Sequence, residues 1–420
     1  RQYHSICKPE GVKDLGEGDN PQIGFDPRNN NFYYCPGERF TPYFDLYHGE
    51  DEPYIEEPAK ATGNDCFHNA PGMNDWYETV KLNYGVDYYA GRVGHFNPIP
   101  DTWSKMTDIL LFWAQKGIDA FRCDMAEMVP TAFWQWAIDK VKFIYPDVQF
   151  IGEVYDPAQY RAYLAAGFDL LYDKVGMYDC LRGVVCGYTP SGEITRAWQA
   201  TDDIRRHMLY FLENHDEQRI ASDFFAADAR KGLPALVVAT LLNDCPFMLY
   251  AGQELGERGM EVEGFSGHDG RTTIFDYWTV DSIRRAFFDR RRLRKEEREL
   301  EKAYLQVLQI ANNEKAIREG LSFDLMYVNP HLAQHQYAFL RKAATDVLLV
   351  VANFDDEQVD AEVNIPNHAF EFLAIPERKF KADDLLSTDV MSGELKADGA
   401  VAMTVPAHGA RVWKLKLFIQ

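Results

Sequence analysis

The sequence lacks long apolar runs and an excess of basic residues. No apolar stretch approaches the roughly 18 residues that a membrane span needs, so we expect no membrane partner. Asp and Glu number 65 against 44 Lys and Arg, which gives a formal net charge of −21 and disfavours binding to nucleic acid. The 420 residues exceed the roughly 250 to 300 that one hydrophobic core serves, so we expect two or three domains.

Cysteine is also scarce, with seven residues and no C-x-x-C pair. The spacing excludes a zinc ribbon, and the odd number argues against a disulfide framework. We therefore expect mostly small buried thiols and a reducing, cytoplasmic compartment. Because the first residue is Arg1 and not Met, we also expect that further chain precedes it. His68, His95 and His268 have no partner at metal-ligand spacing, so they indicate no metal site.

Composition divides the chain into three parts. Residues 1–100 are rich in Gly, Pro, Asn, Asp and Tyr and lack periodicity, which predicts a loop-rich domain. Residues 101–320 alternate helical patterns with five short apolar runs, which predicts a parallel sheet, and five strands suffice for a doubly wound fold. Residues 321–420 contain five short strand patterns separated by turns, which predict a separate antiparallel domain: QYAFLRK, DVLLVVANF, DAEVNI, AVAMTV and ARVWKLKL.

Individual segments are predicted in more detail. PDTWSKMTDILLFWAQKG should form a helix that begins at Asp101 and ends before Gly117. Residues 281–320 should be helical with a solvated face, because charges of both signs alternate along them. The acidic stretch over residues 45–58 is expected to be a solvated loop, with a cation site as the alternative. Four aromatic residues of the first part are expected to pack within loops, although they could stack on a sugar: Tyr33, Tyr34, Trp76 and Tyr77.

Acidic side chains follow three of the predicted strands. In IDAFRCD, Arg122 and Asp124 share one face because strand side chains alternate, while Cys123 points to the core. Glu153 ends the next strand, and His215 with Asp216 ends a later one. Each acid alone would more often anchor a loop or cap a helix. Because active sites gather at the carboxyl edge of parallel sheets, we expect all of them to meet there.

Such a cluster suits glycoside transfer. Crowded like charges raise the pKa of one carboxyl group, as a general acid requires, while Arg122 would keep Asp124 ionised as a nucleophile. These are the two groups that retaining glycoside hydrolysis needs, about 5 to 5.5 Å apart.

The strings GIDAFRCD, FIGEVYD and FLENHDEQR resemble, in order, the second, third and fourth sequence regions of the α-amylase superfamily, glycoside hydrolase family thirteen. Outside these regions, VKLNYG, GQELG, DGRTTIFDYW and PAHGARVWKLK also resemble segments of the family. The resemblance implies that Asp124 is the nucleophile and Glu153 the general acid/base. It implies that Asp216 stabilises the transition state, with Arg122 and His215 in the same sugar subsite.

The resemblance also implies a fold. We expect an α/β protein with a (β/α)8 TIM-type barrel whose first three strands are missing from this chain. Residues 1–100 would be a loop-rich inserted domain between the third barrel strand and the third helix. Residues 101–320 would hold barrel strands four to eight, and residues 321–420 a C-terminal antiparallel β-sandwich.

The chain departs from the family pattern at two places. The first region, an Asp followed by Asn-His, is absent, which would leave the sugar subsite incomplete. After the nucleophile, Glu127 and Met128 stand where many α-amylases have Lys-His, so we expect these two residues to alter binding on the acceptor side.

The resulting prediction is a retaining α-glucan hydrolase or transglycosylase that acts on starch-derived maltooligosaccharides. The alternatives are a catalytically impaired carbohydrate-binding relative, and an isomerase or transferase of the same superfamily. No cofactor is required, while calcium is possible with ligands that are not identified.

Overall fold

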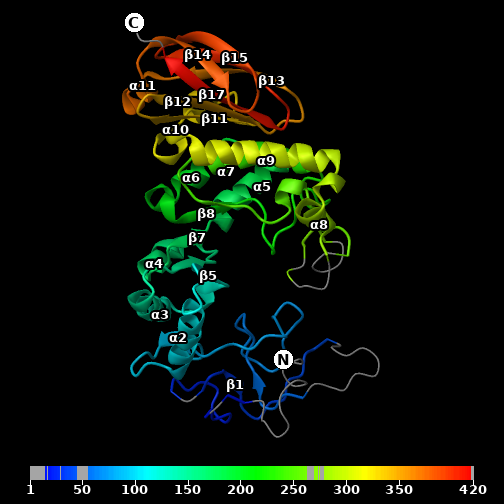
Figure 1. The fold of residues 1–420 in the computed structure, drawn as a ribbon. Helices are drawn as coiled ribbons and strands as arrows, with labels where there is room; N and C mark the ends of the chain where they lie inside the picture. The colour runs from blue at the N-terminus through cyan, green and yellow to red at the C-terminus, as the bar shows by residue number, and fades with distance from the viewer. Residues whose placement is uncertain are drawn as a thin grey trace. The chain divides into compact units, whose positions relative to one another are not determined.

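The structure, a computed structural model, describes residues 15–417 except 17, 29, 45–54, 263–268, 273 and 275–278. Arg1, Cys7, His268 and most of the acidic stretch therefore lie outside the described residues. The chain divides into two compact units, residues 1–154 with 159–169, and residues 155–158 with 170–420 (Figure 1). Among the described helices, none combines the length and the apolar character that a membrane crossing demands. The predicted limits at residues 100 and 320 remain predictions.

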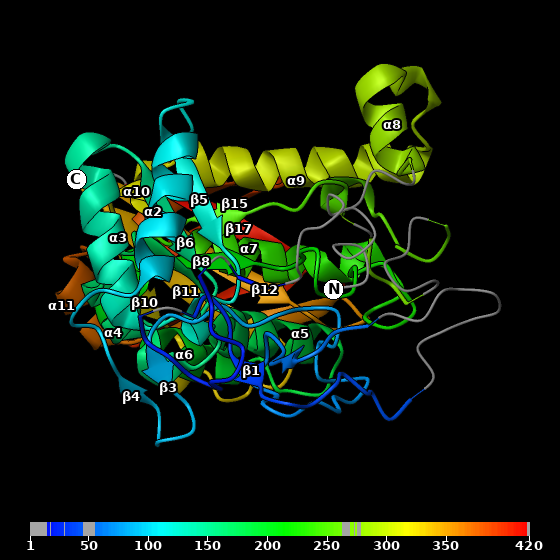
Figure 2. The same ribbon diagram turned by 90° about the horizontal axis from the view of Figure 1, so that it is seen from below.

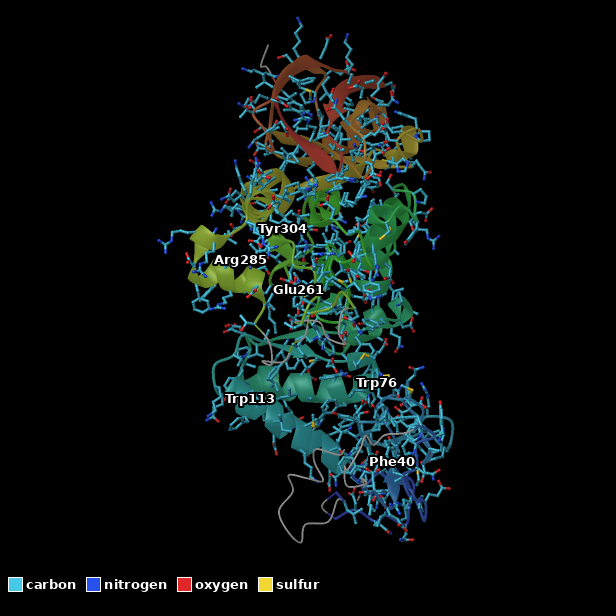
Figure 3. The ribbon with its side chains drawn as sticks, turned by 90° about the vertical axis from the view of Figure 1, so that its right-hand side faces the viewer. Phe40, Trp76, Trp113, Glu261, Arg285 and Tyr304 are labelled. Atoms are coloured by element: carbon cyan, nitrogen blue, oxygen red, sulfur yellow. The ribbon has the colours of Figure 1, made fainter. Side chains whose placement is uncertain are left out.

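The loop-rich part of the first unit is held together by two short antiparallel strand pairs. Strand β1 (Tyr34–Cys35) pairs with β2 (Ala59–Lys60), and β3 (Val86–Asp87) pairs with β4 (Val93–Gly94). Phe40, which is labelled in Figure 3, is buried in a small core with residues of β1 and β2.

The aromatic residues of this part confirm the prediction of loop packing in three cases. Tyr33 and Tyr34 are 1% and 0% exposed, and Tyr77 packs against the small core around Phe40. Trp76 differs, because 39% of it is exposed (Figure 3). The hydroxyl of Tyr33 donates to the carbonyl oxygen of Val86 at 2.7 Å, which gives this buried polar atom a partner.

The rest of the first unit alternates helices and parallel strands, as predicted. The elements in chain order are α2 (Asp101–Ala114), β5 (Ala120–Cys123), α3 (Thr131–Ile144), β6 (Gln149–Gly152) and α4 (Tyr160–Ala165). Strands β5 and β6 pair in parallel. Helix α2 begins at the predicted residue, and the left-handed backbone of Gly117 (φ +84°) follows its end.

The second unit continues with three parallel strands. Its elements are β7 (Leu170–Tyr172), α5 (Asp179–Val185), α6 (Glu193–Gln199), β8 (Met208–Phe211), α7 (Leu233–Leu241) and β9 (Phe247–Met248). Strand β7 pairs with β8, and β8 pairs with β9. All four residues of β8 are buried, which accounts for the continuous apolar run in its sequence.

The segment over residues 281–320 is helical, as predicted, and it is divided into three helices. It forms α8 (Asp281–Phe288), α9 (Lys295–Asn313) and α10 (Lys315–Arg318). Helix α9 runs beside α7 (Figure 2). Arg285 of α8, labelled in Figure 3, reaches Glu297 in the first turn of α9 with a separation of 2.5 Å. The break between the helices lets this ion pair form between them.

The described C-terminal residues form antiparallel sheets together with the α-helix α11 (Asn367–Leu373). One sheet has the order β10-β11-β12-β17-β14-β15, and β13 pairs with β16. The strands are β10 (Leu321–Asp324), β11 (Gln336–Ala343), β12 (Asp346–Asn353), β13 (Val359–Ile365), β14 (Arg378–Asp384), β15 (Val390–Leu395), β16 (Gly399–Val405) and β17 (Gly409–Leu417). The five strands predicted there are confirmed, and β10, β14 and β15 are additional.

Candidate active site

Arg122 and Asp124 lie at the carboxyl end of β5 and contact each other. Nη1 of Arg122 lies 2.5 Å from Oδ1 of Asp124, and the Asp124 side chain is 75% exposed. The contact confirms that alternation places both side chains on one face. Between them, Cys123 is buried, and this burial raises the pKa of its thiol to about 12, so the thiol stays neutral in the core.

Glu153 directly follows β6 and turns toward the same residues. Its backbone N–H donates to the carbonyl oxygen of Cys123 at 3.1 Å, which continues the β5–β6 pairing. Its side chain is only 2% exposed, and Oε1 lies 2.9 Å from Nη2 of Arg122. Its Oε2 accepts the backbone N–H of Met125 at 2.8 Å. The structure thus brings Arg122, Asp124 and Glu153 together, as the sequence predicts.

The two carboxylates share one guanidinium but have different surroundings. Asp124 is open to solvent, whereas Glu153 is enclosed and bonded to a backbone amide. The planar guanidinium fixes the orientation of both groups, because its nitrogen atoms form a rigid fork. Two carboxylates in contrasting environments are a common arrangement for one nucleophile and one acid.

Glu127 and Met128 lie in the single helical turn (Ala126–Met128) that follows Asp124. Met125 precedes this turn in the left-handed conformation (φ 42°), and its N–H thereby reaches Glu153. Burial raises the pKa of Tyr163 in α4, and the nearby Glu127 carboxylate raises it further. Glu127 therefore lies close to α4, and its predicted role in substrate binding, like that of Met128, stays a prediction.

His215 and Asp216 follow β8 in the second unit. Nε2 of His215 lies 3.1 Å from Oδ2 of Asp216. The buried Asn214 shapes the turn, because its Oδ1 accepts the backbone N–H groups of Asp216 and Glu217, both at 2.9 Å. The structure brings these two predicted residues together. Their meeting with Asp124 and Glu153, which belong to the first unit, stays a prediction.

A buried ion pair fixes the ends of this loop. Nη1 of Arg219 lies 2.7 Å from Oε2 of Glu213, and both side chains are at most 2% exposed. Arg219 also donates to Oγ1 of Thr272 at 2.6 Å and to the carbonyl oxygen of Ala251 at 2.9 Å. Oε1 of Glu213 accepts the backbone N–H of Ile220 at 2.7 Å. The loop with Asp216 is thereby closed by charged groups that water cannot readily reach.

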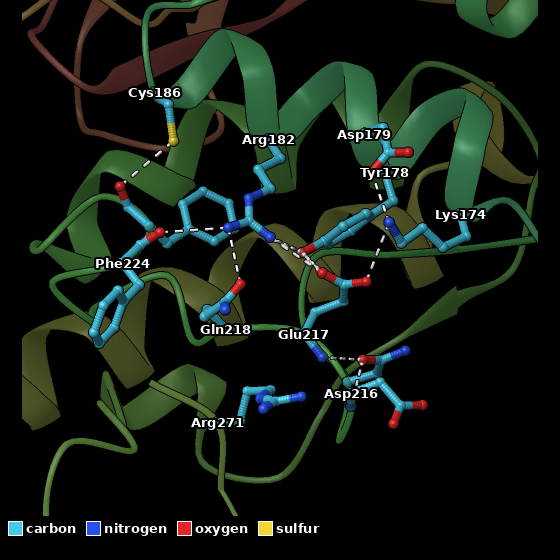
Figure 4. A network of polar contacts seen from close by, with 12 residues as sticks. Lys174, Tyr178, Asp179, Arg182, Cys186, Asp216, Glu217, Gln218, Phe224 and Arg271 are labelled. Atoms are coloured by element: carbon cyan, nitrogen blue, oxygen red, sulfur yellow. Dashed lines mark hydrogen bonds and ion pairs between the residues drawn. The ribbon is translucent and has the colours of Figure 1, made fainter. Parts of the chain in front are cut away.

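Glu217 connects the same loop to the segment after β7 (Figure 4). Its Oε1 lies 3.1 Å from Nζ of Lys174, and its Oε2 lies 3.1 Å from Nη1 of Arg182. The Tyr178 hydroxyl lies 3.2 Å from Oε2. Arg182 also donates to Oε1 of Gln218 at 2.9 Å. Two cations and a phenol therefore hold the residue next to Asp216.

Comparison with known proteins finds α-amylases and a maltosyltransferase among the similar proteins. Alpha-amylase 3 of Dictyoglomus thermophilum is 28% identical over 224 residues, 49% of this chain and 44% of that protein. The alpha-1,4-glucan:maltose-1-phosphate maltosyltransferase of Cereibacter sphaeroides is 39% identical over 110 residues, 25% of this chain and 17% of that protein. The crystal structure of an α-amylase from Geobacillus thermoleovorans, complexed with acarbose, shares the fold with a TM-score of 0.60 at 18% identity. This match covers 83% of this chain and 68% of that chain.

The chain is thus similar in sequence and in fold to members of the α-amylase superfamily. No protein-family model matches it, and it covers less than half the length of the two curated relatives described above. The structural likeness indicates the TIM-barrel type of fold, to which the parallel strands β5 to β9 conform. The number of barrel strands expected outside this chain stays a prediction.

The sequence-based prediction of the site missed three charged residues near Asp216. They are Glu213, Glu217 and Arg219, all inside the string FLENHDEQR. The sequence does show a run of charged residues directly after a fully apolar strand. A charged side chain that is buried at such a place needs a partner of opposite charge. The alternation of side chains along one strand does not identify this partner when the partner lies on another segment of the chain.

Among the residues that the structure describes, no three His, Cys, Asp or Glu side chains lie close enough together to hold a metal ion. His68 lies with Nε2 3.4 Å from Sγ of Cys66, and the ring of His95 lies beside Phe25. Glu56 from the acidic stretch is buried and lies near Lys60. The possible calcium site therefore stays a prediction without assigned ligands.

Proposed function

We propose that this protein is a retaining α-glucan hydrolase or transglycosylase that acts on starch-derived maltooligosaccharides. The observation that carries the proposal is the pair of carboxylates, Asp124 and Glu153, on one guanidinium of Arg122. Relatives named as α-amylase and as maltosyltransferase support α-glucosidic linkages as the substrate class.

In the proposed reaction Asp124 attacks the anomeric carbon, and the bond from this carbon to the glycosidic oxygen breaks. Glu153 gives its proton to the departing oxygen, so the leaving sugar departs as an alcohol. Glu153, now a carboxylate, then removes a proton from water or from an acceptor sugar, which displaces Asp124. Both steps use carboxylates of the chain itself.

Asp216 and His215 would bind hydroxyl groups of the sugar that is attacked. Their mutual contact of 3.1 Å and the turn around Asn214 hold both polar groups in place. Preorganised donors and acceptors contribute more to catalysis than flexible ones, because they need no rearrangement in the transition state.

The proposal is tested by trapping the intermediate with a fluorinated glucosyl donor, followed by intact mass spectrometry and peptide mapping. We expect an adduct on Asp124. Glu153→Gln should abolish turnover while sugar binding survives, whereas Glu193→Gln, the same change at a carboxylate of α6 that has no assigned role, should retain turnover. An active Glu153→Gln variant, or an adduct on another residue, would contradict the proposal.

Chromatography of the products decides between hydrolysis and transfer. A maltooligosaccharide incubated with the protein should yield shorter sugars only, if water is the acceptor. Products longer than the substrate would show transfer, for which the similarity to a maltosyltransferase provides a specific reason.

A further inference from the structure

We propose a second sugar-binding pocket in the loop-rich part of the first unit, which takes a glucosyl residue of an α-glucan chain. The pocket is open to solvent and has a volume of about 510 Å³. Its side chains include Phe25, Phe67 and Tyr89, with the polar residues Glu38, His68 and Asp87 beside them. We call it the Tyr89 pocket. None of the residues assigned to the proposed reaction lines it, and the choice of ligand rests on the proposed function.

The aromatic walls of the Tyr89 pocket are held rigidly. Phe25 stacks on Tyr33 with 5.8 Å between the ring centroids, and Phe67 stacks on Tyr88 at 4.8 Å. The Tyr89 ring meets the Phe67 ring edge-on at 5.6 Å. Rings that are already ordered lose little conformational freedom when a ligand binds.

Tyr89 is the most accessible of these rings, with 53% of the residue exposed. Its backbone is fixed by Asp87, whose Oδ1 accepts the N–H groups of Tyr89 and Ala90 at 2.9 and 3.0 Å. Its hydroxyl donates to the carbonyl oxygen of Tyr34 at 3.4 Å. Tyr89 thus offers an anchored aromatic surface that solvent and ligands can reach.

Carboxylates accompany this aromatic surface. Glu38 and Asp87 line the pocket together with Tyr89. Burial, with the Cys35 thiol and these two carboxylates, raises the pKa of Tyr89 to about 12. The phenol stays neutral and able to donate. The exposed Glu38 carboxylate, which lines the pocket, adds an acceptor.

This chemistry suits a pyranose ring. A sugar has an apolar C–H face that packs on an aromatic ring and a rim of hydroxyl groups that donate to carboxylates. Among the described residues that line the pocket there is no Lys or Arg, so a phosphate or another anion is disfavoured. An organic cation could also use aromatic rings and carboxylates, and the experiment includes it as a competing outcome.

The test uses the 420-residue chain and measures two quantities for each variant. The first is retention in a native gel that contains amylopectin, and the second is turnover of a short chromogenic maltoside. Tyr89→Ala should weaken amylopectin binding about tenfold and leave turnover of the short substrate unchanged. Tyr89→Phe keeps the ring and should retain most of the binding.

Two further variants complete the test. Glu38→Ala removes a carboxylate that lines the pocket, so it should weaken binding, and because the side chain is exposed the protein should stay folded. Tyr43→Ala is the matched control, because Tyr43 belongs to the same unit, is 78% exposed and does not line the pocket. It should leave both quantities unchanged, and thermal unfolding should confirm that each variant is folded.

The proposed pocket would be contradicted if wild type, Tyr89→Ala and Glu38→Ala were retained equally in the amylopectin gel. It would also be contradicted if the gel did not retain the wild type. Calorimetric binding of tetramethylammonium together with no binding of maltotriose would also overturn it. If the chain proves inactive on glucans but Tyr89→Ala still loses retention, the proposed reaction fails while the pocket is supported.

Discussion

Nη2 of Arg122 lies 2.9 Å from Oε1 of Glu153, so the cation of one strand end meets the enclosed carboxylate of the next. The other nitrogen of the same guanidinium, Nη1, lies 2.5 Å from Oδ1 of Asp124. One side chain therefore positions both groups of the proposed reaction. This arrangement requires a forked cation, because an ammonium group offers a single nitrogen.

Arg122→Lys should keep the positive charge but lose one of the two contacts. We expect kcat/KM on a maltooligosaccharide to fall on the order of 10²-fold, since the two carboxylates lose their common orientation. Arg196→Lys is the matched control, because the Arg196 side chain is 88% exposed, and it should be neutral. Activity of Arg122→Lys within twofold of wild type would show that the fork is dispensable.

Glu217→Gln should reduce catalysis through Asp216. Removing the carboxylate leaves Lys174 and Arg182 without their shared partner, so the loop next to Asp216 should move. We expect kcat to fall about tenfold with a smaller change in KM, measured by steady-state kinetics. Glu193→Gln, which removes a more exposed carboxylate opposite Arg196, should change neither constant. A purely structural role would instead change only the free energy of unfolding.

Asp173 should make stability depend on pH. It is fully buried at the end of β7, and burial raises its pKa from 3.8 to about 6. The folded state therefore binds this proton more tightly than the unfolded state, and the stabilising contribution is present below pH 3.8. It is lost as the pH rises from about 4 to 6, at a cost on the order of 3 kcal/mol.

Asp173→Asn should remove this contribution to the pH dependence, because the amide does not titrate in that range. Urea unfolding of wild type and variant at pH 4, 5, 6 and 7 measures the free energy of unfolding directly. The difference between the two proteins should change between pH 4 and 6 and stay constant above. Parallel curves over the whole range would contradict the raised pKa.

Arg341→Met should destabilise the second unit. The buried guanidinium donates to the carbonyl oxygens of Leu242, Ala316 and Ile317 at 2.9, 3.1 and 2.5 Å. Methionine can fill the space but leaves these acceptors without a donor, so the free energy of unfolding should fall by about 3 kcal/mol. Arg318→Met, an exposed neighbour, should change it by less than about 0.5 kcal/mol in the same denaturant titration. Equal stability of the two variants would refute the role of Arg341.

The element order of the first unit could be predicted because its signals are local. Helix α2 begins at Asp101 and is followed by Gly117, and β5 carries Arg122 and Asp124 on one face. Periodicity and alternation depend only on neighbouring residues. Strand β14 was missed because charged residues occupy its solvent face, which leaves a weak apolar pattern.

The sequence by itself determined which residue types end the parallel strands, and therefore which carboxylates could take part in chemistry. The tertiary structure decided their partners. Arg122 contacts Glu153 because β5 and β6 pair in parallel, and Glu217 meets Arg182 because the segment after β7 folds beside the loop after β8. Contacts of this kind join residues that lie far apart in the chain, so they depend on which segments pack together and not on local pattern.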